Sequence, residues 1–169
     1  MDLFFVKYDL REEMESNSYS WQEILFALKH KIITADDVIE YATCIINEDT
    51  LGFEIVIEIA CLSENEDIFP YLEQLVSLEI TQDISSIKDK WLYLILKWLY
   101  KKRKFVVNAL DMVEEIYAIF DYPDSINSFV RYMPSESGDL GSVELNRERL
   151  YKNWAYYLEQ YEEDHLDNM

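Results

Sequence analysis

Residues 20–45 read SWQEILFALKHKIITADDVIEYATCI, and this stretch contains two helix starts in succession. Ser20 precedes Glu23 by three positions, the spacing of a capping box in which hydroxyl and carboxylate each accept a backbone N–H. Thr34 opens the next segment in the same way. Apolar residues follow at helical spacing: Trp21, Ile24, Leu25 and Leu28, then Val38, Ile39, Tyr41, Ala42 and Ile45. The stretch predicts two short helices joined by a brief turn.

Similar signals continue along the chain and predict further helices. Four of the expected helices cover 51–62, 85–102, 125–132 and 143–163. A further helix is opened by Ser63 and Glu66, carries Pro70 in its first turn and runs toward Leu78. Another is capped by Asn108. Two of the three glycines fall in 133–142, which is expected to be an exposed loop, and residues 165–169 are expected to fray. Residues 3–8 could form a short strand or an extended strap.

The expected fold class is therefore all-α, either an irregular helical bundle or an α-superhelix of stacked antiparallel helix pairs. Half of the 169 residues are apolar and 15% are aromatic, which supplies a core and excludes an acidic disordered tail. We expect one domain over residues 1–169. Residues 51–62 are apolar on nearly every side except at Gly52, Glu54 and Glu58, which predicts a central helix with a narrow solvent strip. Cys44 and Cys61 are expected to be small buried hydrophobes.

Charge is distributed unevenly along the chain. The formal net charge is −19, and residues 32–87 contain thirteen acids but no Lys, Arg or His. Such a field attracts basic partners and opposes direct binding to DNA or RNA. The one basic cluster comprises Lys97, Lys101, Lys102, Arg103 and Lys104. It fits the negative C-terminal end of a helix dipole, and docking of an anionic group is the alternative.

No membrane segment or secretory signal is expected. The longest apolar stretch in the second half, residues 91–100, is interrupted by Lys97, whereas a membrane helix needs ~20 mostly apolar residues. The first residues lack the basic and apolar regions of a signal peptide. We therefore expect a cytoplasmic protein.

Groups for catalysis are scarce in the sequence. The chain has two histidines, and we interpret His30 as a residue near a helix C-terminus. Glu162 and His165 form a single Glu-x-x-His pair, whereas di-iron bundles need two such pairs. No phosphate-binding glycine loop is present. We expect no enzymatic activity, no cofactor and no metal.

Partner binding is the function class that the acids favour. Glu54 and Glu58 lie four positions apart without a basic residue in helical reach, so a cationic partner could relieve their repulsion. A solvated helix strip is the alternative interpretation. The candidate partner-binding residues are Asp36, Glu40, Glu54, Glu58, Glu73, Asp121 and Tyr122.

Several short motifs resemble a bacterial family of unknown function that is often found in toxin and immunity gene clusters. They are FDYPD at 120–124, SFVRYMP at 128–134, SWQEI at 20–24 and ITADDV at 33–38. The resemblance implies an immunity-like role, in which a small protein binds and neutralises a cognate toxin domain, such as a basic nuclease. Two alternatives remain open from the residues: an α-solenoid adaptor for several proteins, and a metal-dependent hydrolase built on clustered carboxylates.

Overall fold

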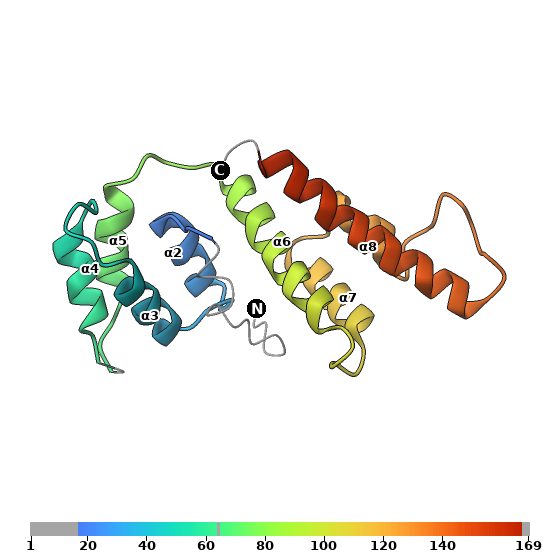
Figure 1. Cartoon of the computed structure of the whole chain (residues 1–169), viewed down its shortest axis with the longest axis horizontal. Coiled ribbons are helices and arrows are strands. Elements are labelled where there is room, and N and C mark those ends of the chain that lie inside the picture. Colours follow the sequence, from blue (N-terminus) through green and yellow to red (C-terminus); the bar gives the residue numbers. More distant parts are fainter. Residues whose placement is uncertain (1–16, 64, 167–169) are drawn as a thin grey trace. The chain divides into compact units, whose positions relative to one another are not determined.

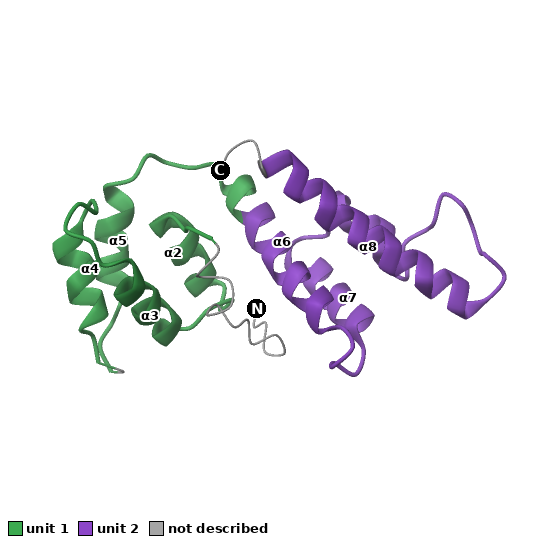
Figure 2. Cartoon of the chain, viewed as in Figure 1, with its two compact units in different colours: residues 1–87 green, residues 88–169 purple. Residues whose placement is uncertain are grey.

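The computed structural model describes residues 17–63 and 65–166, and every regular element in these ranges is a helix (Figure 1). The elements are α2 (Trp21–Lys29), α3 (Ala35–Ile45), α4 (Phe53–Ala60), α5 (Phe69–Ser77), α6 (Ile84–Lys102), α7 (Ala109–Ile119), the 3-10 helix η1 (Asp124–Phe129) and α8 (Val143–Leu166). The all-α prediction is confirmed. The proposed strand at 3–8 lies outside the described residues. The chain divides into two compact units, unit 1 (Met1–Ile87) and unit 2 (Lys88–Met169) (Figure 2).

Both capping boxes of unit 1 form as predicted. The Ser20 hydroxyl accepts the Glu23 N–H at 3.1 Å, and the Glu23 carboxylate accepts the Ser20 N–H at 2.9 Å. At α3, the Thr34 N–H donates to the Asp37 carboxylate at 2.8 Å, and the Asp37 N–H donates to the Thr34 hydroxyl at 3.3 Å. These local bonds satisfy N–H groups that the first helical turn leaves unpaired, so both helices begin where the sequence predicts.

The core of unit 1 forms where α3 packs on α4, α2 on α5, and α4 on α5. Its buried side chains include Trp21, Ile24, Val38, Tyr41, Val56, Ile59, Leu72 and Leu75. The Tyr41 ring meets Trp21 edge-on at 5.8 Å, and its hydroxyl donates to the Tyr19 carbonyl at 2.9 Å. Burial raises the pKa of Tyr41. Aromatic side chains thus join the start of α2 to α3.

One acid of unit 1 has a structural role that the sequence does not reveal. The Glu79 carboxylate accepts the N–H of Trp21 at 2.7 Å and that of Gln22 at 3.0 Å. The Gln22 side chain in turn donates to the Ile80 carbonyl and accepts the Gln82 N–H. A carboxylate at a helix N-terminus is favoured by the helix dipole, so the segment after α5 is fastened to the first turn of α2.

The predicted central position of α4 is wrong. Only Val56 and Ile59 of this helix are buried, whereas Leu51 is 64% exposed and Ile57 is 37% exposed. Gly52 precedes the helix with φ +76°, and a Cβ there would lie 2.5 Å from a Leu75 methyl carbon. Among the described helices α4 makes its main contacts with α3 and α5, and Glu54, Ile57 and Glu58 on another side of it are exposed.

Two further expectations in unit 1 need correction. Cys44 and Cys61 are exposed, not buried, because each lies on the outward side of its helix. Ser63 and Glu66 do form hydrogen bonds, at 2.8 Å and 2.7 Å, but these close a turn, and α5 begins only at Phe69. Pro70 lies in the first turn of α5, where its missing N–H costs nothing.

Unit 2 is organised around α6 and α8. Residues 91–96 of α6 are buried on every side of the helix. Trp154 of α8 is fully buried and stacks on Phe129 of η1 with ring centroids 5.8 Å apart. Tyr93 of α6 stacks on Tyr161 of α8 at 4.1 Å. The helix expected over 125–132 is the shorter 3-10 helix η1.

Candidate functional site

The predicted partner-binding residues fall into two groups that belong to different units. The unit 1 group lies on three helices that pack in the order α3, α4, α5. Its exposed members are Asp36 on α3, Glu54 and Glu58 on α4, and Glu73 on α5, and its half-buried member is Glu40 on α3. Asp121 and Tyr122 belong to unit 2. We therefore consider the five acids of unit 1 and the residues of unit 2 as separate candidate sites.

Only part of the acidity of unit 1 is available to a partner. Asp37, Glu66 and Glu79 accept backbone N–H groups near helix starts or turns, and so do Asp67 and Asp83. The pKa of Glu66 is lowered because its carboxylate accepts the Ser63 N–H and hydroxyl. Within residues 17–63 and 65–166, the carboxylates of Asp36, Glu54, Glu58 and Glu73 make no hydrogen bond or ion pair. Local capping patterns in the sequence pointed to Asp37 and Glu66, but not to the long-range role of Glu79.

The outer face of α4, defined as Leu51, Glu54, Ile57, Glu58 and Cys61, combines charge with exposed apolar surface. All five residues are exposed and lie three or four positions apart along this segment. Two like charges four positions apart cost a helix about 0.2–0.5 kcal/mol. A partner surface that is both basic and apolar would offset the repulsion between Glu54 and Glu58 and would bury the exposed apolar side chains of this face.

Asp121 and Tyr122 form the left-handed end of α7. Their φ angles are +62° and +58°, and the Tyr122 N–H donates to the Tyr117 carbonyl at 2.9 Å. The Asp121 carboxylate pairs with Lys88 at 2.9 Å. Tyr122 is 60% exposed and meets Tyr117 edge-on. Both residues are exposed, but the Asp121 carboxylate already pairs with Lys88.

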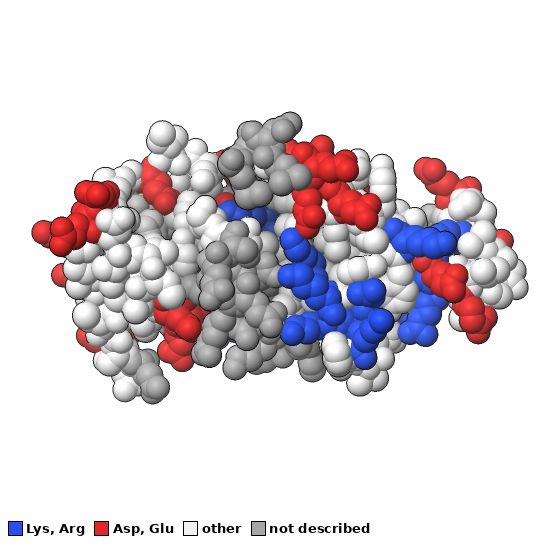
Figure 3. All heavy atoms as spheres, in the orientation of Figure 1, with Lys and Arg blue, Asp and Glu red and all other residues white. Residues whose placement is uncertain are grey.

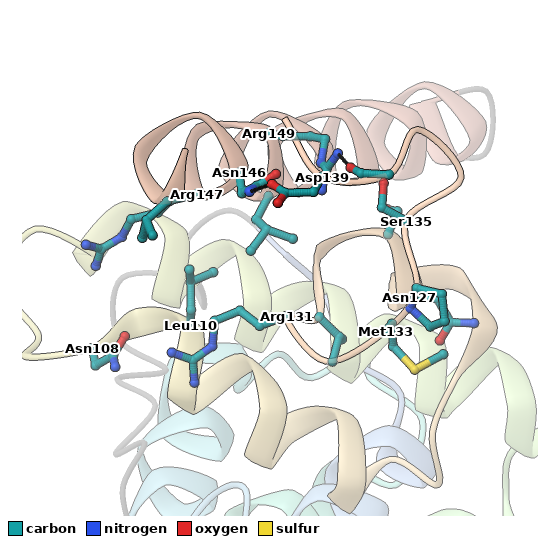
Figure 4. Close-up of a pocket in the computed structure, with 16 residues that line it drawn as sticks. Asn108, Leu110, Asn127, Arg131, Met133, Ser135, Asp139, Asn146, Arg147 and Arg149 are labelled. Carbon is teal, nitrogen blue, oxygen red and sulfur yellow. Dashed lines mark hydrogen bonds between the residues drawn. The ribbon is translucent and has the colours of Figure 1, made fainter. Parts of the chain in front are cut away.

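A groove of about 630 Å³ opens in unit 2 beside the start of α7 and the first turns of α8 (Figure 4). We call it the arginine groove, because three arginines line it. The lining residues are Asn108, Leu110, Asn127, Ser128, Val130, Arg131, Met133, Pro134, Ser135, Gly138, Asp139, Val143, Asn146, Arg147, Arg149 and Leu150. No local pattern in the sequence predicts this groove, since it requires α7 and α8 to come together.

Side-chain hydrogen bonds hold the 133–142 loop against α8 and so form one wall of the groove. The Asp139 carboxylate accepts the Asn146 amide at 2.6 Å and the Gly141 N–H at 3.0 Å. The Leu140 N–H donates to Asn146, and Arg149 donates to the Gly138 carbonyl. The bond from Asn146 is the main cause of the lowered pKa of Asp139. The loop is exposed, but its hydrogen bonds to Asn146 and Arg149 attach it to α8.

Arg131 is held at the groove by two acids of α7. Its Nε and Nη2 donate to the Glu114 carboxylate at 2.7 Å and 3.1 Å, and Nη2 also pairs with Asp111. These bonds, led by the one from Glu114, raise the pKa of the guanidinium. Asn108 donates to the same Asp111 carboxylate. Arg131 is therefore oriented by α7 and keeps its charge at all ordinary pH values.

The described residues offer neither a metal-ligand cluster nor a membrane-spanning helix. Residues 17–63 and 65–166 contain no group of three or more His, Cys, Asp or Glu side chains placed to hold a metal ion. None of the helices in the described part of the chain is long and apolar enough to span a bilayer.

Comparison with known proteins identifies a family. The family model described as "Uncharacterized protein conserved in bacteria (DUF2247)" matches residues 12–162. The match leaves out only the first eleven and the last seven residues of the chain. No curated protein and no solved structure matches the chain.

Proposed function

The chain belongs to the bacterial family DUF2247, and we propose that it is a non-enzymatic, cytoplasmic immunity protein that binds and neutralises a basic toxin domain. The outer face of α4 is the observation that carries this proposal. Glu54 and Glu58 lie there without partners among the described residues, beside the exposed Leu51 and Ile57. A surface of this kind is suited to a protein partner that offers cations around an apolar contact.

The charge difference between the units supports the same face. Residues 1–87 carry nineteen Asp and Glu against four Lys and Arg, a formal charge of −15, whereas residues 88–169 carry fifteen against eleven, or −4. On the face drawn in Figure 3, Lys and Arg side chains gather over unit 2. A basic partner would therefore be steered to unit 1, and such steering raises association rates by 10- to about 1,000-fold.

The neighbouring helices extend the proposed contact. Asp36 and Glu40 on α3 and Glu73 on α5 belong to the two helices that pack against α4. A toxin domain that acts on nucleic acid carries cations in its substrate channel, and an acidic cover over that channel would block it. The proposed mechanism is occlusion by charge complementarity, with apolar contacts that slow dissociation.

The test is capture of partners from the native cytoplasm by the tagged full chain, at low and at high salt. We expect one stoichiometric basic partner that is weakened by salt. Replacing Glu54 and Glu58 together by Gln should raise the Kd for this partner by about tenfold or more. Loss of one member of a buried interfacial charge pair costs about 2 kcal/mol or more, and each 1.4 kcal/mol is a factor of ten in Kd. The matched control is E144Q/E148Q, because these two exposed acids also lie four positions apart but belong to unit 2.

Each outcome of this experiment decides between stated alternatives. Equal weakening by both double variants would assign the effect to net charge and contradict a contact at α4. Several weak partners would favour the adaptor function. Recovery of no stoichiometric basic partner would reject the immunity function itself.

A further inference from the structure

Three of the four charged residues that line the arginine groove are arginines, although the protein as a whole is strongly acidic. The groove lining includes Arg131, Arg147 and Arg149 but one carboxylate, Asp139. That carboxylate is engaged by Asn146 and Gly141. Charge compensation of Arg131 comes from Asp111 and Glu114, which are not among the lining residues. The groove therefore presents guanidinium groups to whatever enters it.

Several donors in the groove are unused. The bonds of Arg131 to Glu114 and Asp111 occupy Nε and Nη2, which leaves the two N–H groups of Nη1 without an acceptor in the described part of the chain. Arg147 makes no hydrogen bond or ion pair with any residue in 17–63 or 65–166. Figure 4 shows Arg147 extending toward the side of the groove where Asn108 and Leu110 lie, with the Arg131 side chain on the same side. Planar guanidinium groups match the paired oxygens of a carboxylate or phosphate.

The walls of the groove are fixed before any ligand arrives. Arg131 is oriented by two acids of α7, and Arg149 is tied to the Gly138 carbonyl at 2.5 Å. The loop that carries Asp139 is fastened to Asn146. Because Arg131 is pre-oriented, it loses less conformational entropy on binding a ligand than a mobile arginine would.

Apolar groups complete the lining. Leu110 and Val130 are buried, and Leu150, Met133 and Pro134 lie beside them in the groove. The volume of about 630 Å³ falls within the ~300–1,000 Å³ typical of small-molecule sites. Because the groove is lined by both apolar side chains and guanidinium groups, it suits an anion that carries an apolar group better than a bare inorganic ion.

We propose that the arginine groove binds a small organic oxyanion, a carboxylate or phosphate monoester on an apolar body, with Arg147 and the Nη1 group of Arg131 contacting the oxygens. This site is separate from the proposed toxin-binding face. It lies wholly in unit 2, whereas α4 belongs to unit 1. The two proposals can therefore fail independently.

The test is calorimetric titration of the full chain with phenyl phosphate, benzoate and benzyl alcohol. These probes share an aromatic body and differ in the oxyanion. We expect saturable binding of one or both anions, and whichever binds more tightly identifies the preferred group. Arg147→Ala should weaken that binding by about tenfold, the effect of losing one bidentate contact. Lys152→Ala is the matched control, since Lys152 is an exposed cation of α8 outside the groove, and should change binding less than twofold.

Folding of the variants is checked by their helical circular dichroism, and E54Q/E58Q should bind the probes as the unmodified chain does. The proposal is overturned if neither anion binds at concentrations up to about 10 mM, well above a Kd of ~1 mM. Equal binding of benzyl alcohol, or equal weakening by the Arg147 and Lys152 variants, would overturn it as well.

Discussion

Glu162 of α8 joins a small polar cluster on α6 in which each residue has a defined partner. Its carboxylate accepts the Tyr93 hydroxyl at 2.7 Å and the Lys97 ammonium at 2.8 Å. These two hydrogen bonds, led by that from Lys97, lower the pKa of Glu162. Lys97 was expected to complement the C-terminal dipole of its helix, and the described contact is instead an ion pair with the last helix. Single residues thus link α6 to α8.

The lowered pKa makes a prediction about pH. A carboxyl group whose pKa is lower in the folded state stabilises that state above its unfolded pKa, and this contribution disappears as pH falls through the folded pKa. Glu162→Gln should therefore reduce the free energy of unfolding at pH 7, and the difference from the unmodified chain should shrink toward about pH 3. Urea unfolding at both pH values measures this. Glu159→Gln is the control, because Glu159 is an exposed neighbour without a partner in the described residues, and it should change the free energy of unfolding at pH 7 by less than about 0.5 kcal/mol.

At the scale of elements, the attachment of α2 depends on Glu79, which is distant in sequence. Two backbone N–H groups of α2 and the Gln22 side chain donate to this one carboxylate. Removal of a hydrogen-bonded charged acceptor leaves those donors without their partner, so Glu79→Ala should lower the free energy of unfolding by about 1.5–3 kcal/mol. Glu73→Ala on α5 should change it by less than about 0.5 kcal/mol, because Glu73 is exposed. Equal effects in urea titrations would contradict the assigned role of Glu79.

The starts of the unit 1 helices show which features of the fold could be predicted from the sequence. The Ser20 and Thr34 capping boxes depend on residues three positions apart, and both helices begin where these signals lie. The Ser63 signal failed at the same local level, since its bonds to Glu66 close a turn without starting a helix. The cap from Glu79 joins positions 57 or 58 residues apart, and no local pattern can predict such a contact.

The candidate sites likewise divide into features set by local sequence and features set by contacts between distant residues. Hydrophobic composition predicted a helix near residues 51–62 but not which side of it would pack, so the exposure of Ile57 and Cys61 was missed. Glu54 and Glu58 were chosen as candidates because their spacing is local and no base lies nearby in sequence, and their role in binding stays a prediction. The arginine groove was not predicted, because Arg131 lines the same groove as Arg147 and Arg149 only through the packing of η1 on α8.

At the scale of the whole molecule, the uneven charge should govern stability as well as binding. A formal charge of −15 in residues 1–87 is self-repelling, and the Debye length falls from ~30 Å at 0.01 M to ~8 Å at 0.15 M salt. Screening should therefore raise the urea midpoint of unfolding as NaCl is added over this range. Hydrogen exchange should show a larger gain of protection for amides of α2–α5 than for those of α7 and α8.

The double variant E54Q/E58Q separates this repulsion from a general effect of salt. Removal of two unpaired like charges from unit 1 should raise the midpoint at 0.01 M salt and reduce the further gain on adding NaCl. E144Q/E148Q removes the same charge from unit 2 and should reduce that gain less, because unit 2 carries only −4. A midpoint that falls with salt would mean that attractive ion pairs, such as those of Arg131 and Lys97, outweigh the repulsion in unit 1. The unpaired acids of unit 1 would then cost the folded chain little stability.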